Sequence, residues 1–119
     1  MRSVAKTISL KVGDTPMNFR LEKLDAFSGA RLLKFLSLTK SEDLQDLLFG
    51  LQDADRDALM RSCLHSVFAL LPAGPARVLD GDCWGVPDLE FDAFLCLRLT
   101  LEVIAWTLEG FFQESGSLS

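Results

Sequence analysis

Residues 84–112 read WGVPDLEFDAFLCLRLTLEVIAWTLEGFF, and this stretch decides how the rest of the chain must be organised. Its second part, residues 93–112, is too apolar for an ordinary surface helix. Read as a helix, it carries one continuous apolar seam, at alternating spacings of three and four, formed by Phe94, Leu97, Leu101, Ile104, Leu108 and Phe111. A second stripe beside the seam consists of Leu95, Leu99, Val103 and Trp106. Because little of its surface is polar, this helix must be covered on most sides, either by its own domain or by another protein.

Charged side chains argue against a membrane span in the same stretch. Arg98, Glu102 and Glu109 interrupt the apolar residues, and a charge near the centre of a span costs roughly 2.5 to 3.5 kcal/mol. Arg98 and Glu102 are four residues apart, a spacing at which opposite charges pair along one helix turn. We therefore expect an amphipathic helix with one ion pair, and no membrane partner.

Length and composition indicate one globular domain over residues 1–119. Hydrophobic residues make up 49% of the 119 residues, and the formal net charge is −5, whereas proteins that bind nucleic acid by electrostatics are basic. No nucleic-acid partner is expected. The first residues lack the apolar run of a secretion signal, so the protein is expected to remain in the cytoplasm. The three cysteines have no C-x-x-C spacing and are expected to be buried thiols.

Outward from the last helix, the pattern predicts an α+β fold that is mainly α. Residues 1–24 alternate apolar and polar side chains around a turn at 13–16, which predicts a β-hairpin. Residues 25–72 are assigned to helices, 73–88 to a turn or short hairpin that contains Trp84, 89–113 to the last helix, and 114–119 to a frayed tail. The expected fold is thus a hairpin followed by about four helices.

Three helices are predicted within residues 25–72. Asp25 can cap the first, over 25–38. Thr39 and Glu42 have the spacing of a capping box for a second helix over about 41–50. A third is predicted to start at Asp53 or Asp55 and to be stopped by Pro72. The apolar residues with helical spacing that predict it are Met60, Cys63, Leu64, Val67, Phe68 and Leu71.

No catalytic, cofactor or metal site is predicted. The segment 80–91 places acids like a calcium loop, but Phe91 stands where the bidentate glutamate belongs. Cys63 and His65 are two residues apart on a predicted helix and point in different directions, so they cannot form a nucleophile and base pair. We expect no enzyme activity.

At residues 84–112, together with the upstream segment RVLDG at 77–81, the chain resembles the tail assembly chaperones of long-tailed bacteriophages and prophages. The layout is similar over at least residues 6–112: a β-hairpin, several helices, a tryptophan-containing turn, and a last helix of acid, apolar run and Phe-Phe. This resemblance implies a cytoplasmic assembly factor of the bacterial host that is absent from the mature virion. It implies that the protein binds and solubilises the tape measure protein and recruits tail tube subunits.

A groove between apolar helices is the surface that best holds an amphipathic helix of such a client. The candidate residues for a groove that binds the client or another copy are Leu97, Leu101, Ile104, Trp106, Leu108, Phe111 and Phe112. Trp84 is either a plug for the core or an exposed anchor for a partner. Contacts between copies, through the hairpin edge or the last helix, would make the protein a homo-oligomer.

An alternative is a small self-associating adaptor or inhibitor that docks on a host protein through the same apolar C-terminal helix. A structural component of the virion is a third possibility. A burial pattern in which the candidate residues simply form the core is the plainest interpretation of the same sequence.

Overall fold

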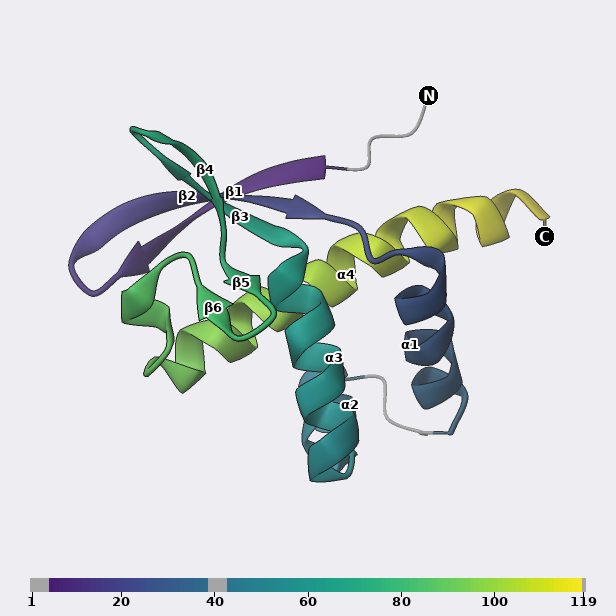
Figure 1. Ribbon diagram of the computed structural model, residues 1–119. Helices are drawn as coiled ribbons and strands as arrows, with labels where there is room; N and C mark the ends of the chain where they lie inside the picture. Colours follow the sequence, from purple (N-terminus) through teal and green to yellow (C-terminus); the bar gives the residue numbers. More distant parts are fainter. Residues whose placement is uncertain (1–4, 39–42, 119) are drawn as a thin grey trace.

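A computed structural model describes residues 5–38 and 43–118, with side chains as far as Glu109. The four strands of its main sheet are antiparallel and lie in the order β1 (Ala5–Val12), β2 (Thr15–Glu22), β3 (Val67–Leu71) and β4 (Gly74–Arg77). A separate small sheet consists of β5 (Leu79–Asp80) and β6 (Cys83–Trp84). The helical elements are α1 (Ala26–Leu38), α2 (Leu44–Gly50), α3 (Asp53–His65), the 3-10 turn η1 (Pro87–Leu89) and α4 (Ala93–Leu118). In Figure 1, α4 crosses the molecule from the β5–β6 hairpin to the side that carries α1.

The predicted N-terminal hairpin is confirmed. β1 and β2 pair along their full length, from Ala5 opposite Glu22 to Val12 opposite Thr15. Gly13 has a φ of 63° in the two-residue turn between them, a conformation that glycine adopts without steric cost. The apolar face of the hairpin lies on the core, where β2 contacts α4.

The mainly α fold class is wrong, because the chain has a four-stranded sheet where a hairpin alone was expected. α3 ends at His65 instead of continuing to Pro72. After the single residue Ser66, the chain enters β3, turns, and returns as β4. The fold is therefore α+β with a substantial sheet, and its third helix is shorter than predicted.

Pairing with β2 explains why residues 67–71 form a strand. Val67 lies opposite Leu21 and Ala69 opposite Phe19, and all four side chains are fully buried. A continued helix would leave the inner edge of β2 without backbone partners, whereas β3 satisfies that edge and buries alternate residues. A short apolar run before a proline has no periodicity that separates a buried strand from the end of a helix.

The first helices start close to the predicted positions. α1 begins directly after Asp25, the predicted cap. α2 begins at Leu44, and the Asp43 carboxylate caps it by accepting a hydrogen bond of 2.8 Å from the Gln45 amide. The predicted capping pair of Thr39 and Glu42 lies outside the described residues. α3 begins at Asp53, one of the two predicted starts.

The predicted small hairpin before the last helix is present as β5 and β6. Leu79 lies opposite Trp84 and Asp80 opposite Cys83, around a turn in which Gly81 has a φ of 63°. The polypeptide then approaches the main sheet closely.

Gly85 makes this close approach. Its amide donates a hydrogen bond of 3.0 Å to the Val78 carbonyl oxygen, and the Val78 amide donates one of 2.9 Å to Val67 of β3. A Cβ atom at Gly85 would collide with the Arg77 carbonyl oxygen. Glycine is therefore required at the junction of the two sheets.

The last helix starts later and ends later than predicted. Pro87 and Asp88 belong to η1, and α4 starts at Ala93, where the Asp92 carboxylate accepts a hydrogen bond of 3.0 Å from the Leu95 amide. The backbone stays helical through Leu118, beyond the predicted end at residue 113.

One side of α4 forms the centre of the core. Its buried residues are Leu95, Cys96, Leu99, Thr100, Val103, Ile104 and Leu108. The Thr100 hydroxyl donates a hydrogen bond of 2.8 Å to the Cys96 carbonyl oxygen, so this buried polar group is satisfied. α4 contacts α3, β2 and the short helix α2.

Candidate functional site

The residues predicted to form an interaction groove lie in three different environments. Ile104 and Leu108 are 0% and 6% exposed and belong to the core. Leu97, Leu101 and Trp106 are half-buried at its edge. The side chains of Phe111 and Phe112 lie outside the described residues. The predicted set therefore does not form one continuous accessible surface within the part of the chain that the structure describes.

Leu97 and Leu101 are brought together with α2 in an apolar groove. The groove has a volume of about 270 Å³. Its lining residues are Gln45, Leu48 and Phe49 from α2, and Phe94, Leu97, Arg98 and Leu101 from α4. Two aromatic side chains of this lining are strongly exposed, Phe94 at 81% and Phe49 at 52%. An exposed apolar concavity of this kind is typical of a surface that binds another molecule.

The outward direction of Phe49 follows from how α2 is anchored. Leu47 and Leu48 are almost completely buried, and they hold the seven-residue helix on the core. Phe49, the next residue, is then turned toward solvent. α2 ends at Gly50, so no further turn of helix covers the groove.

The α4 side of the groove is a straight row of apolar side chains. Phe94, Leu97 and Leu101 stand at positions i, i+3 and i+7, which spans about 10.5 Å along a helix axis. Arg98 lies within the row and forms an ion pair with Glu102, with 3.1 Å between Arg98 Nε and Glu102 Oε1. This pair, which the sequence predicted, gives the apolar groove a charged rim.

Sequence reasoning missed the two most exposed members of the groove as site residues. Phe94 was placed in the apolar seam but not among the candidate contacts, and Phe49 was not singled out. The available signal was that Phe49 follows Leu47 and Leu48, so its side chain cannot share their buried direction in the same helix.

Trp84 lies against the core. It is half-buried and packs on the core cluster, and it lines a second concavity together with Met60, Leu64 and Cys96. Its position in β6, opposite Leu79, agrees with a plug for the end of the core and places it away from the groove between α2 and α4.

Trp106 is covered by two cationic side chains. Lys23 Nζ lies 4.6 Å from the centre of its ring and Lys6 Nζ lies 5.7 Å from it, distances typical of cation–π contacts. The neighbouring Thr107 hydroxyl accepts a hydrogen bond of 3.1 Å from the Leu24 amide. This end of α4 is thus joined to β1 and to the segment after β2.

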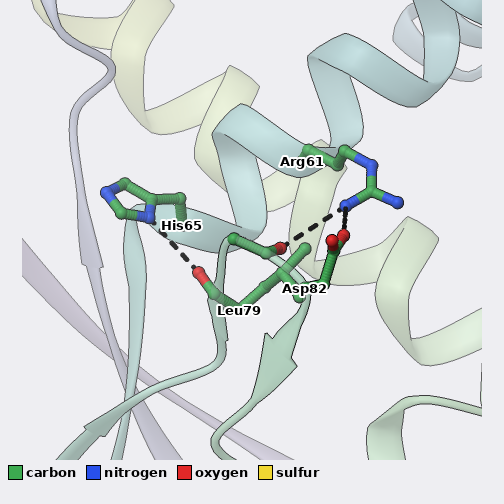
Figure 2. A network of polar contacts seen from close by, with 5 residues as sticks. Arg61, His65, Leu79 and Asp82 are labelled. Atoms are coloured by element: carbon green, nitrogen blue, oxygen red, sulfur yellow. Dashed lines mark hydrogen bonds and ion pairs between the residues drawn. The ribbon is translucent and has the colours of Figure 1, made fainter.

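Another concavity, of about 670 Å³, lies where α3 meets the β5–β6 hairpin, and most of the side chains that line it are polar or charged. Figure 2 shows its hydrogen bonds: Arg61 Nη1 lies 3.1 Å from Asp82 Oδ1 and 3.4 Å from the Gly81 carbonyl oxygen. His65 Nδ1 lies 3.3 Å from the Leu79 carbonyl oxygen. These contacts join the end of α3 to the small hairpin.

The cysteines fall into two classes. Burial raises the pKa of the Cys63 thiol to about 12. Burial, together with the nearby Asp92 carboxylate, raises the pKa of the Cys96 thiol to about 11. Cys83, in β6, is exposed, which corrects the expectation that all three thiols are buried.

No protein-family model, curated protein or solved structure matches this chain. Within residues 5–38 and 43–118, no helix has both the length and the apolar character needed to cross a lipid bilayer.

Proposed function

We propose that this chain is a tail assembly chaperone of a long-tailed bacteriophage or prophage. In this proposal it binds the tape measure protein, keeps it soluble and recruits tail tube subunits during assembly. It acts without enzymatic chemistry, in the cytoplasm of the bacterial host, and is absent from the mature virion. The resemblance of residues 84–112 to that family suggests the proposal, and the groove between α2 and α4 is the observation that supports it most.

The dimensions of the groove suit an amphipathic helix. Phe94 and Leu101 are separated by about 10.5 Å along α4, or two helical turns, so the groove matches client anchors at positions i, i+3 or i+4, and i+7. Phe49 stands on the α2 side of the groove, across from this row. A helical client of the tape measure type would bury its apolar stripe between these two walls.

The charge of the chain fits a protein that carries an apolar client. With a net charge of −5, many copies along one client would repel other such complexes and keep them in solution. Contacts between copies would add avidity to the individual contacts with the client. A homo-oligomer on the client is therefore part of the proposal.

The experiment is co-expression of this chain with the tape measure protein encoded beside it, followed by size exclusion with light scattering. We expect soluble tape measure protein that elutes with many copies of this chain. The double variant Phe49→Ser with Phe94→Ser is expected to stay folded and to leave the tape measure protein insoluble. Phe27→Ser is the matched control, since Phe27 is 87% exposed on α1 but does not line the groove.

Two results would contradict the proposal. The first is an insoluble tape measure protein beside free wild-type chain, which would favour the adaptor or inhibitor of a folded host protein. The second is the presence of this chain in purified virions, which would favour a structural component.

A further inference from the structure

The two edges of the main sheet differ in their capacity to accept another strand. β4 has four residues and contains Pro75, which has no amide hydrogen. β1 has eight residues without proline or glycine. An exposed edge of this length is a template for pairing with another strand.

The direction of the β1 backbone groups follows from one hydrogen bond on the far side of β2. The Glu22 amide donates to the Ser66 carbonyl oxygen at 2.8 Å, so it points away from β1 and the pair Ala5–Glu22 is not hydrogen-bonded. Antiparallel pairs alternate between the two kinds. Lys11 therefore also faces Pro16 in a pair without hydrogen bonds, which fits a proline at that position.

By the same alternation, Thr7, Ser9 and Lys11 direct their amides and carbonyl groups to the open side of β1. All three residues are exposed, and no other described residue hydrogen-bonds to their backbone groups. These three alternate residues thus present backbone donors and acceptors to which another strand can hydrogen-bond.

We propose that β1 pairs with β1 of a second copy of this chain, antiparallel, with Ser9 opposite Ser9. In this register each Thr7 lies opposite Lys11 of the other copy. All three outward-facing residues then exchange backbone hydrogen bonds, and the two four-stranded sheets become one continuous sheet with a two-fold axis between the Ser9 residues.

The side chains of β1 are complementary to themselves in this register. On the core side, Ile8 lies opposite Leu10 of the other copy twice, and both are partly buried apolar residues packed against the core. Lys6 lies opposite Val12, so no two lysines face each other. β1 holds no acidic residue, so two copies cannot form an ion pair across this interface. A suitable register therefore has only to keep the lysines of the two copies apart.

The neighbouring register with the same faces fits less well. Centred on Ile8, it places Ile8 opposite Ile8 and Lys6 opposite Leu10, so one apolar pair replaces the two Ile8–Leu10 pairs while the number of mixed pairs stays the same. A shift by a single residue would turn the core-facing side chains of one copy toward solvent. The register centred on Leu10 pairs Ile8 with Val12, but it places Thr7 opposite Gly13, beyond the end of β1. The register centred on Ser9 keeps all three outward-facing residues paired within the strand and also forms both Ile8–Leu10 pairs, so it is the best supported.

Light scattering coupled to size exclusion, from micromolar to millimolar concentration, tests the pairing. A ladder of three residue pairs is small for an interface, so we expect a weak dimer that forms as concentration rises. Ser9→Lys places two like charges on the two-fold axis and is expected to raise the dissociation constant about fivefold. Ser9→Glu alone has the same effect, and an equimolar mixture of the two variants restores dimers.

A cysteine pair tests the register, in a Cys83→Ser background that removes the exposed native thiol. Ser9→Cys is expected to form a disulfide-linked dimer on mild oxidation, since opposite Cα atoms in such a pair lie about 5.5 Å apart. Thr7→Cys is the matched control on the same face, with its two copies about 13 Å apart along the strands.

Three outcomes would overturn the inference. They are a monomer at every concentration, an oligomer that Ser9→Lys leaves unchanged, and equal crosslinking through Thr7→Cys and Ser9→Cys. None of these outcomes depends on binding of the tape measure protein, so the pairing and the proposed function can fail separately.

Discussion

The two apolar stripes of α4 start one residue apart, and their first parts lie in opposite environments. Leu95, Leu99 and Val103 are buried in the core, whereas Phe94, Leu97 and Leu101 form one wall of an open groove. The residue types are alike, so hydrophobicity does not separate core from contact surface here. Phe94, Leu97 and Leu101 border the seven-residue helix α2, which leaves the groove open, whereas Leu95, Leu99 and Val103 belong to the core cluster.

The strongest test of this difference is Leu99→Ala. Leu99 is 0% exposed, and removal of a buried leucine side chain costs about 3 kcal/mol of unfolding free energy through lost burial and the cavity left behind. Leu97→Ala, in the groove, should cost about 1 kcal/mol or less, because its side chain is only partly covered. Urea unfolding of both variants measures the gap, and equal losses would mean that the stripes are energetically equivalent.

The two buried thiols make the stability of the protein depend on pH. The pKa values of Cys63 and Cys96 are raised in the folded state, so the unfolded chain loses these protons more readily. The contribution of these thiols to stability is therefore fully present below about pH 9, and it is lost as the pH rises through about 11 for Cys96 and about 12 for Cys63. Urea unfolding at pH 7.5 and pH 10, for the wild type and for Cys96→Ala, checks the sign.

Thiol labelling of the native protein at pH 8 independently measures which side of α4 is accessible to solvent. Cys83 should react at once and Cys96 only on unfolding, while an introduced Leu97→Cys should react quickly. Fast labelling of Cys96 would show that the buried stripe of α4 is open.

Leu101→Asp tests the edge of the groove. Leu101 is half-buried, so the carboxylate can remain in contact with water, and we expect a folded protein destabilised by roughly 1 to 2 kcal/mol. Binding to the tape measure protein should be lost. Circular dichroism and co-elution check the two parts, and an unfolded variant would assign Leu101 to the core.

Phe94→Ser is expected to have the smallest effect on stability, within about 0.5 kcal/mol, because an exposed side chain contributes little to folding. Its effect should instead be on client binding, which the same co-elution measures. A drop in melting temperature similar to that of Leu99→Ala would contradict the open groove.

Local sequence rules predicted the elements whose signals lie within a few residues. The hairpin followed from alternation around Gly13, and the start of α1 from Asp25. The strand β3 was missed because its cause is distant: Val67 and Ala69 are extended since Leu21 and Phe19 lie opposite them, almost fifty residues earlier in the chain.

The groove was only half predicted for a related reason. The spacing of Leu97 and Leu101 places them in one row, but it does not show which neighbour covers them. Phe49 became part of the groove because Leu47 and Leu48 dock α2 on the core, a tertiary event without a local signature. Ile104 has the same spacing as the groove residues, and it is buried because other elements lie over its part of α4.

The crowded contact at Gly85 limits which substitutions the chain can tolerate during evolution. Any other residue there would push the Arg77 backbone out of place and separate the two sheets, so substitutions at this position should be eliminated whatever their chemistry. A glycine at this position, between a short hairpin and a long apolar helix, is then a feature by which other chains of this architecture can be recognised even when the rest of their sequence has diverged.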